Sequence, residues 1–171
     1  MSALFMLLRL TLMCCFVIAV PVTAASTVFQ AAVTAFDEPS ISEASPLHFG
    51  SILNTSGSTC SLDNSGTVSG ACVSANANIS VGLIDISGLL ANQEYQIEVV
   101  GSDNGILRFQ PAITVDSIVS TDSDGDQSVS VTTIQPTDTM TISVHGNLEV
   151  LSELQSSDTY QASYTVNVNF Q

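Results

Sequence analysis

The sequence has 171 residues, a length typical of one domain, and 45% of them are hydrophobic, which is enough for a packed core. Charged residues are scarce, at 11%, against an ordinary fraction of about 25%. The formal net charge is −14 at pH 7, from two arginines, no lysine and 16 acidic residues. This balance excludes nucleic acid as a natural partner, because phosphate contacts need lysine and arginine, and it argues against anionic membrane surfaces.

Residues 1–24 have the pattern of a secretory signal peptide. Met1 to Arg9 carries one positive charge, Leu10 to Val20 is an apolar run, and short residues after Pro21 offer a cleavage site near Ala24. The apolar run is shorter than the roughly 20 residues that a membrane span needs. We therefore expect a secreted or cell-surface protein, without stable membrane insertion after cleavage.

The four cysteines divide between the signal peptide and the mature chain. Cys14 and Cys15 leave with the signal peptide, and Cys60 and Cys72 remain. In an exported protein an even pair predicts one disulfide, with two separate buried thiols as the alternative.

Residues 25–45 follow the predicted cleavage site. Between Ser26 and Phe36 apolar residues occupy every second position, which is the period of a β-strand, and Asp37-Glu38-Pro39 interrupts the pattern. The alternating apolar positions that we take as candidates for an assembly strand are Phe29, Ala31 and Val33. This segment predicts either an N-terminal arm or a first strand, ahead of a domain at residues 46–171.

Short alternating segments recur through residues 46–171, with a turn about every ten residues and no helical stripe. The clearest is Glu94 to Val99, where Tyr95, Ile97 and Val99 are expected to face inward. Further apolar positions with this period are Ile79, Val81, Leu107, Phe109, Ile113, Val115, Val129, Val131, Met140, Ile142 and Val144. The spacing predicts an all-β, immunoglobulin-like antiparallel β-sandwich.

The end of the chain has the strongest alternation. Tyr160 to Phe170 predicts one long strand with an apolar face and a polar face. Upstream, His145-Gly146-Asn147 predicts a turn between two strands. The apolar positions of the last segment that we expect to serve in assembly are Tyr164, Val166, Val168 and Phe170.

The loop Asp122-Ser123-Asp124-Gly125-Asp126 is the sharpest local candidate for a ligand site. Asp122, Asp124 and Asp126 can offer carboxylate oxygens to a hard cation such as Ca²⁺. The loop is not an EF-hand, because its glycine is at the fourth position and Thr133 stands at the twelfth. A solvated turn is the competing interpretation.

The sequence contains no catalytic motif. No spacing connects His48 or His145 with a serine and an acid, and the G-x-S-x-G pattern is absent. We expect both histidines at the surface or in turns, and no enzymatic activity. Arg108, the only cation that remains after signal cleavage, is expected to pair with an acidic residue.

Three segments together resemble a bacterial exported family, the domain of unknown function DUF4402. Leu47 to Ile52 is similar to the family's L-x-F-G-x-I opening, Asp138 to Val150 to a strand that leads into a G-G-x-L-x-V turn, and Thr159 to Phe170 to its closing strand. The resemblance covers Pro46 to Gln171. The sequence departs from the family pattern at His145, Asp158, Ala162 and Phe170, which weakens the turn chemistry and leaves the strand pattern intact.

The family is distantly similar to spore-coat-U-like proteins and to chaperone–usher pilus subunits. That resemblance implies export through the periplasm of a Gram-negative bacterium, and self-assembly or binding to a periplasmic chaperone. In pilus subunits an N-terminal strand donated by the next subunit completes an incomplete sandwich. Here a self-complete sandwich, with Ser26 to Phe36 as its own first strand, remains the alternative.

These observations predict an exported structural or adhesive module of a cell surface, in a pilus-like or coat-like assembly. The alternative is a stand-alone secreted module that binds Ca²⁺ or a surface glycan.

Overall fold

The computed structural model describes residues 35, 37–73, 78–115, 118–121 (backbone), 128–156 and 158–171. The predicted signal peptide and the alternating segment Ser26 to Phe36, apart from Ala35, lie outside the described residues. All regular elements of the described part are β-strands, and it contains no helix that is long and apolar enough to cross a membrane. The predicted all-β class is confirmed.

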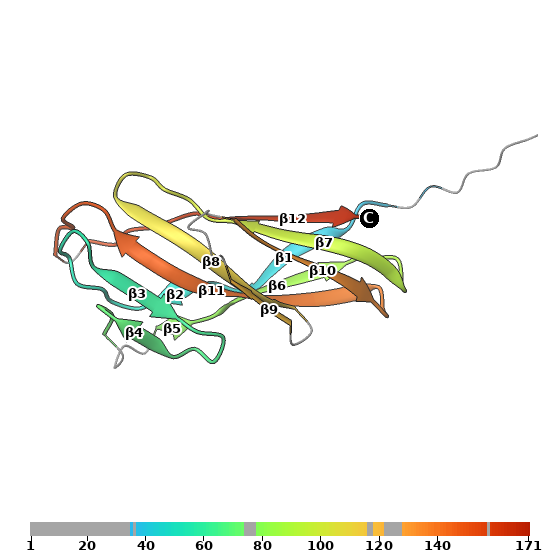
Figure 1. Cartoon of the computed structure of the whole chain (residues 1–171), viewed down its shortest axis with the longest axis horizontal. Helices are drawn as coiled ribbons and strands as arrows, with labels where there is room; N and C mark the ends of the chain where they lie inside the picture. The colour runs from blue at the N-terminus through green and yellow to red at the C-terminus, as the bar shows by residue number, and fades with distance from the viewer. Residues whose placement is uncertain (1–34, 36, 74–77, 116–117, 122–127, 157) are drawn as a thin grey trace, which may run out of the picture. The chain divides into compact units, whose positions relative to one another are not determined.

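Twelve strands make up the described part of the chain (Figure 1). They are β1 (Ser40–Ser45), β2 (His48–Phe49), β3 (Thr59–Leu62), β4 (Val68–Gly70), β5 (Ile79–Ser80), β6 (Gly82–Ser87), β7 (Gln93–Val100), β8 (Leu107–Val115), β9 (Ile118–Thr121), β10 (Ser128–Gln135), β11 (Thr139–Val150) and β12 (Thr165–Phe170).

The larger sheet is organised around β11, and all its pairings are antiparallel. Along one edge β11 pairs first with β6 and then with β3, and along the other edge it pairs with β8. β1 extends the sheet beyond β6, β4 beyond β3, and β9 beyond β8. β1 is thus a terminal strand of this sheet.

The second sheet has the order β10-β7-β12, also antiparallel, and a short pair joins β2 to β5. Residues of β7 and β10 share one hydrophobic core with residues of β6, β8 and β11, so the two larger sheets form the layers of a sandwich. The predicted antiparallel sandwich is therefore confirmed.

The inward residues follow the predicted alternation. Tyr95, Ile97 and Val99 of β7 are at most 1% exposed, and they share one hydrophobic core with Ile142 and Val144 of β11, which are fully buried. Each side chain of this size contributes about 1.5–3 kcal/mol when it is fully buried. These central strands therefore supply much of the stability that holds the two sheets together.

The last strand is shorter than predicted. It begins at Thr165, whereas residues 160–164 are not part of any strand. β12 pairs with β7 only as far as Val100, because the chain beyond it turns toward β8. There the N–H of Phe109 donates to the carbonyl of Ser102 at 2.8 Å. Residues 160–164, which precede β12, are therefore left without a strand to pair with.

The predicted turn at His145-Gly146-Asn147 is also wrong, because these residues lie inside the continuous strand β11. Gly146 has φ 133°, a conformation that side-chain-bearing residues rarely adopt, and a side chain there would collide with the backbone of β8 at Gln110. Here β11 changes its neighbour from β6 to β3. The glycine thus serves a change of strand partner inside the sheet.

Candidate functional site

One side of the sandwich is left open between β1 and β12. Each of these strands pairs with one neighbour, and the other edge of each pairs with no strand of the described chain. Ile41 lies opposite Ile86, and Phe170 lies opposite Tyr95, so all four face the core. Ile86 and Tyr95 are 1% exposed, but Ile41 is 45% exposed and Phe170 is 50% exposed. The core itself is covered, but the apolar edge residues that cover it are half-exposed along this side.

Two segments of the chain line the open side, one on each flank. We call residues 40–54 the N-terminal wall and residues 159–170 the C-terminal wall. Apolar side chains of both walls pack on the core yet remain only half-buried. In the N-terminal wall they are Leu47, Phe49 and Ile52, and in the C-terminal wall Tyr160, Ala162, Tyr164, Val166 and Val168.

The open side deepens at one end into a cavity of about 1170 Å³. Its walls are Pro46–Asn54 and Leu154–Tyr164, apart from residue 157, and Phe109 also lines it. The ring of Phe109 lies 5.8 Å from that of Phe49 and 5.9 Å from that of Tyr164, between centroids. A single aromatic cluster thus joins the two walls.

Tyr164 reaches across the open side. A side chain at Gly82 of β6 would lie 3.2 Å from the Tyr164 hydroxyl and 3.1 Å from Cβ of Leu47. Burial raises the pKa of Tyr164, and the negative charge of Glu43 raises it further. Tyr164 therefore stays neutral, and it is the last residue of the C-terminal wall that lines the cavity, since no residue of β12 does so.

The N-terminal wall is tied to the body of the domain through a disulfide. The N–H of Leu53 donates to Ala71 at 3.0 Å, and the N–H of Val73 donates to Ser51 at 2.8 Å. Cys72 lies between these two bonds and is linked to Cys60 of β3, which is fully buried. The predicted disulfide is present, and it holds this wall in place.

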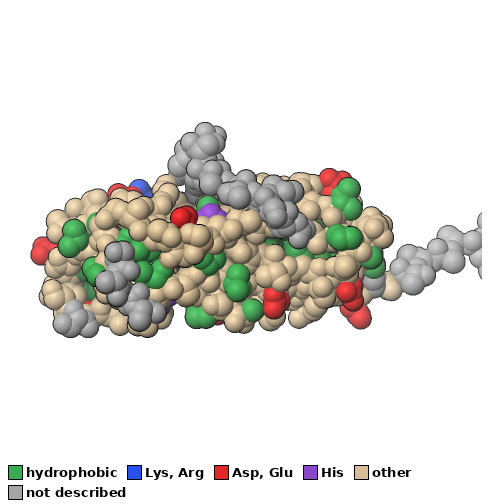
Figure 2. Space-filling view, turned by 90° about the horizontal axis from the view of Figure 1, so that it is seen from below, with side chains coloured by type: hydrophobic (Ala, Val, Ile, Leu, Met, Phe, Trp, Pro, Cys, Tyr) green, Lys and Arg blue, Asp and Glu red, His purple; other side chains and the backbone are tan. Residues whose placement is uncertain are grey.

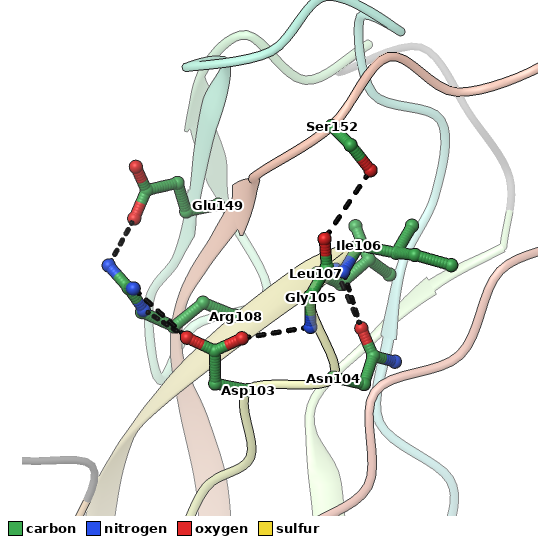
Figure 3. Close-up of polar contacts among 8 residues, drawn as sticks. All are labelled: Asp103, Asn104, Gly105, Ile106, Leu107, Arg108, Glu149 and Ser152. Atoms are coloured by element: carbon green, nitrogen blue, oxygen red, sulfur yellow. Dashed lines mark hydrogen bonds and ion pairs between the residues drawn. The ribbon is translucent and has the colours of Figure 1, made fainter.

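The C-terminal wall is held by the loop that precedes β8. Asn104 donates from its side-chain nitrogen to the carbonyl of Gln161 at 3.0 Å. The other end of the Asn104 side chain accepts the N–H of Ile106 at 3.0 Å and that of Leu107 at 2.8 Å (Figure 3). These three bonds fix the loop and connect it to the wall.

Arg108 pairs with acidic residues, as the sequence predicted. It lies 2.9 Å from Asp103 and 3.2 Å from Glu149 (Figure 3). Hydrogen bonds from the N–H of Gly105 and from Arg108 lower the pKa of Asp103. Because the partners are about one-third exposed, the pairs contribute little to stability, and their role is to order the loop.

The two histidines differ in exposure and in their hydrogen-bond partners. His48 is exposed, and its Nδ1 accepts the N–H of Gly50 at 2.9 Å. His145 is 6% exposed, so its predicted position at the surface or in a turn is wrong. Its Nε2 lies 3.2 Å from the Thr114 hydroxyl, and burial lowers its pKa. Neither histidine has a carboxylate as a hydrogen-bond partner within the described residues.

The predicted Ca²⁺ ligands Asp122, Asp124 and Asp126 lie outside the described residues. Elsewhere in the described chain, no group of three or more histidine, cysteine or acidic side chains could hold a metal ion. On the face drawn in Figure 2, hydrophobic side chains reach the surface at several places among backbone and other side chains, and charged side chains are few. The open side is the best-defined candidate site, and the predicted assembly residues Tyr164, Val166, Val168 and Phe170 lie along it.

A family model described as Domain of unknown function (DUF4402) matches residues 40–170. This chain belongs to the DUF4402 family. No curated protein matches the sequence. The family match begins with β1 and ends with β12, so both walls of the open side belong to the DUF4402 domain. The alternating segment Ser26 to Phe36 precedes it.

Proposed function

We propose that this protein is an exported structural module that assembles with other copies of itself at the cell surface by accepting a β-strand along its open side. The observation that carries the proposal is the pair of edge strands, β1 and β12, whose inward faces remain half-exposed. A strand added to such edges supplies main-chain hydrogen bonds, and its alternate side chains cover the core.

The segment Ser26 to Phe36 of a second copy suits the open side. Its apolar residues alternate, as an added strand requires. It has no charged residue, although the protein as a whole carries a net charge of −14. Docking this segment therefore brings no additional negative charge to the N-terminal wall, where Glu43 lies.

The residues between the segment and β1 favour a second copy, rather than the same chain, as the source of the added strand. A hairpin of the segment onto its own β1 would need a reversal at Asp37, Glu38 and Pro39. None of these residues belongs to a turn. Glu38 precedes a proline, which favours extended backbone. The absence of a turn at residues 37–39 supports a second copy as the source of the added strand.

The proposal is tested by size-exclusion chromatography with light scattering on the mature protein, with and without residues 26–36. We expect the full mature chain to form concentration-dependent higher species, and the shortened chain to remain monomeric. Adding a synthetic peptide of residues 26–36 to the shortened chain should raise its melting temperature, and a scrambled peptide of the same composition should not.

Two results contradict the proposal. If both forms are stable monomers, the segment has no role in assembly. If the full chain is a monomer and the shortened chain unfolds, the segment is the first strand of its own sandwich.

A further inference from the structure

The open side is deeper at one end than at the other, and this difference in depth indicates which side chains an added strand needs. The cavity between Pro46–Asn54 and Leu154–Tyr164 is deep and is lined by the aromatic rings of Phe49, Phe109 and Tyr164. Beyond Tyr164 the open side is a shallow trough between β1 and β12, floored by half-buried valines of β12. A strand that covers both parts needs one bulky side chain, followed by small ones.

The segment Ser26 to Phe36 has this order of sizes. On its alternating face one large residue, Phe29, precedes three smaller ones, Ala31, Val33 and Ala35. Phe29 and Ala35 are six residues apart, as are Tyr164 and Phe170. Six residues of strand span about 20 Å. A strand with Phe29 at the cavity therefore places Ala35 beside Phe170, at the end of the trough.

We infer that the ring-lined part of the cavity is an anchor site for a single bulky apolar side chain, and that Phe29 of a second copy inserts there, against Phe49, Phe109 and Tyr164. This inference rests on the proposed function. Phe29 would join the existing cluster of three rings, where aromatic pairs gain from edge-to-face contacts beyond the burial of area. The register also sets a direction: the incoming strand runs parallel to β12 and antiparallel to β1.

The test uses the full mature chain and measures the concentration at which half of the protein is assembled. We expect Phe29→Ala to raise this concentration by at least about 100-fold, the lower bound for the loss of a fully buried phenylalanine. Phe36→Ala is the matched control, because in an added strand positions 29 and 36 fall on opposite faces. It should change the concentration by less than about threefold, the range of a contact at the rim of an interface.

A second variant adds a bulky side chain to the cavity itself, in the molecule that accepts the strand. Ala162 is half-buried and lines the cavity, so Ala162→Phe should exclude Phe29 and weaken assembly. Combining Ala162→Phe with Phe29→Ala should restore assembly, because the ring added at position 162 then takes the place of the ring removed at position 29. Asn169→Phe, at an exposed position outside the cavity, is the control. Urea unfolding of each variant verifies that it is folded.

The outcomes separate the two proposals. If deleting residues 26–36 abolishes assembly but Phe29→Ala and Phe36→Ala weaken it equally, the anchor is wrong and the proposed function stands. If the double variant assembles no better than Ala162→Phe alone, the anchor is also wrong. If the deletion leaves assembly unchanged, the proposed function itself fails.

Discussion

Gly82 shows how a single residue keeps the open side in shape. The backbone of β6 passes under Leu47 and the hydroxyl of Tyr164, and both occupy space that a side chain at position 82 would need. The backbone angle is ordinary here, so the constraint is packing alone. Any larger residue must displace Leu47 or Tyr164, which come from opposite walls.

We expect Gly82→Val to lower the free energy of unfolding by about 1–3 kcal/mol, the usual cost of overpacking. Urea denaturation measures this change. Ser87→Val on the same strand, at an exposed position, should leave the free energy nearly unchanged. Adding Tyr164→Phe to Gly82→Val should recover part of the loss, because the hydroxyl is then removed. No loss in the single variant would show that Tyr164 does not reach across the open side.

His145 makes the stability of the domain depend on pH. Burial lowers its pKa below the ordinary 6.5, so the unfolded chain takes up this proton at a higher pH than the folded chain does. Its contribution to stability is complete above pH 6.5 and is lost as the pH falls toward the folded pKa. The pKa values of Asp63 and Asp103 are also lowered, but from 3.8. These two carboxyl groups therefore change the stability only at a lower pH than His145 does.

Between pH 7 and pH 5, the free energy of unfolding should therefore fall more steeply in the wild type than in His145→Gln. Urea unfolding at a series of pH values measures both slopes. Charge repulsion among the many acids changes equally in the two proteins, so the difference between the slopes isolates His145. Equal slopes would contradict the assignment of a buried neutral imidazole.

Among the elements, the N-terminal wall depends on one covalent link. The wall segment Ser51–Leu53 bonds to residues 71–73, and Cys72 connects these residues to β3 through Cys60. Loss of the disulfide frees both segments together. The wall should then loosen before the central strands, whose ladders do not pass through it.

We expect the double variant Cys60→Ser/Cys72→Ser to lose about 2–4 kcal/mol of stability. Amide hydrogen exchange at Leu53 and Val73 should speed up more than at Ile97. A reducing agent should reproduce the effect in the wild type and change nothing in the double variant, which is the control. Uniform faster exchange over the whole domain would show that the disulfide does not act on the wall in particular.

The elements also show what alternation can predict. The inward residues of β7, β10 and β11 follow from period two, because that pattern reports which face is buried. The same pattern continues through Tyr160 and Ala162, yet these residues have no strand partner, because β7 turns away after Val100. Alternation is local and carries no information about neighbours. The open side, which is a missing neighbour, could therefore be seen only in the fold.

At the scale of the whole molecule, charge opposes the proposed assembly. The chain carries a net charge of −14, so copies that approach one another repel. The uncharged segment Ser26 to Phe36 and the apolar cavity offer contacts that do not depend on ionic attraction. Assembly should therefore become stronger as salt screens the repulsion, the opposite of an interface held by ion pairs.

We expect the concentration for half-assembly of the mature chain to fall when sodium chloride is raised from about 0.01 M to about 0.15 M, where the Debye length shortens from about 30 Å to about 8 Å. Light scattering over a concentration series measures it. Calcium chloride at matched ionic strength is the control, and an extra effect of Ca²⁺ would indicate a specific site such as the loop with Asp122, Asp124 and Asp126. Weaker assembly in sodium chloride would mean that ion pairs hold the copies together, and the strand-accepting open side would no longer explain the interface.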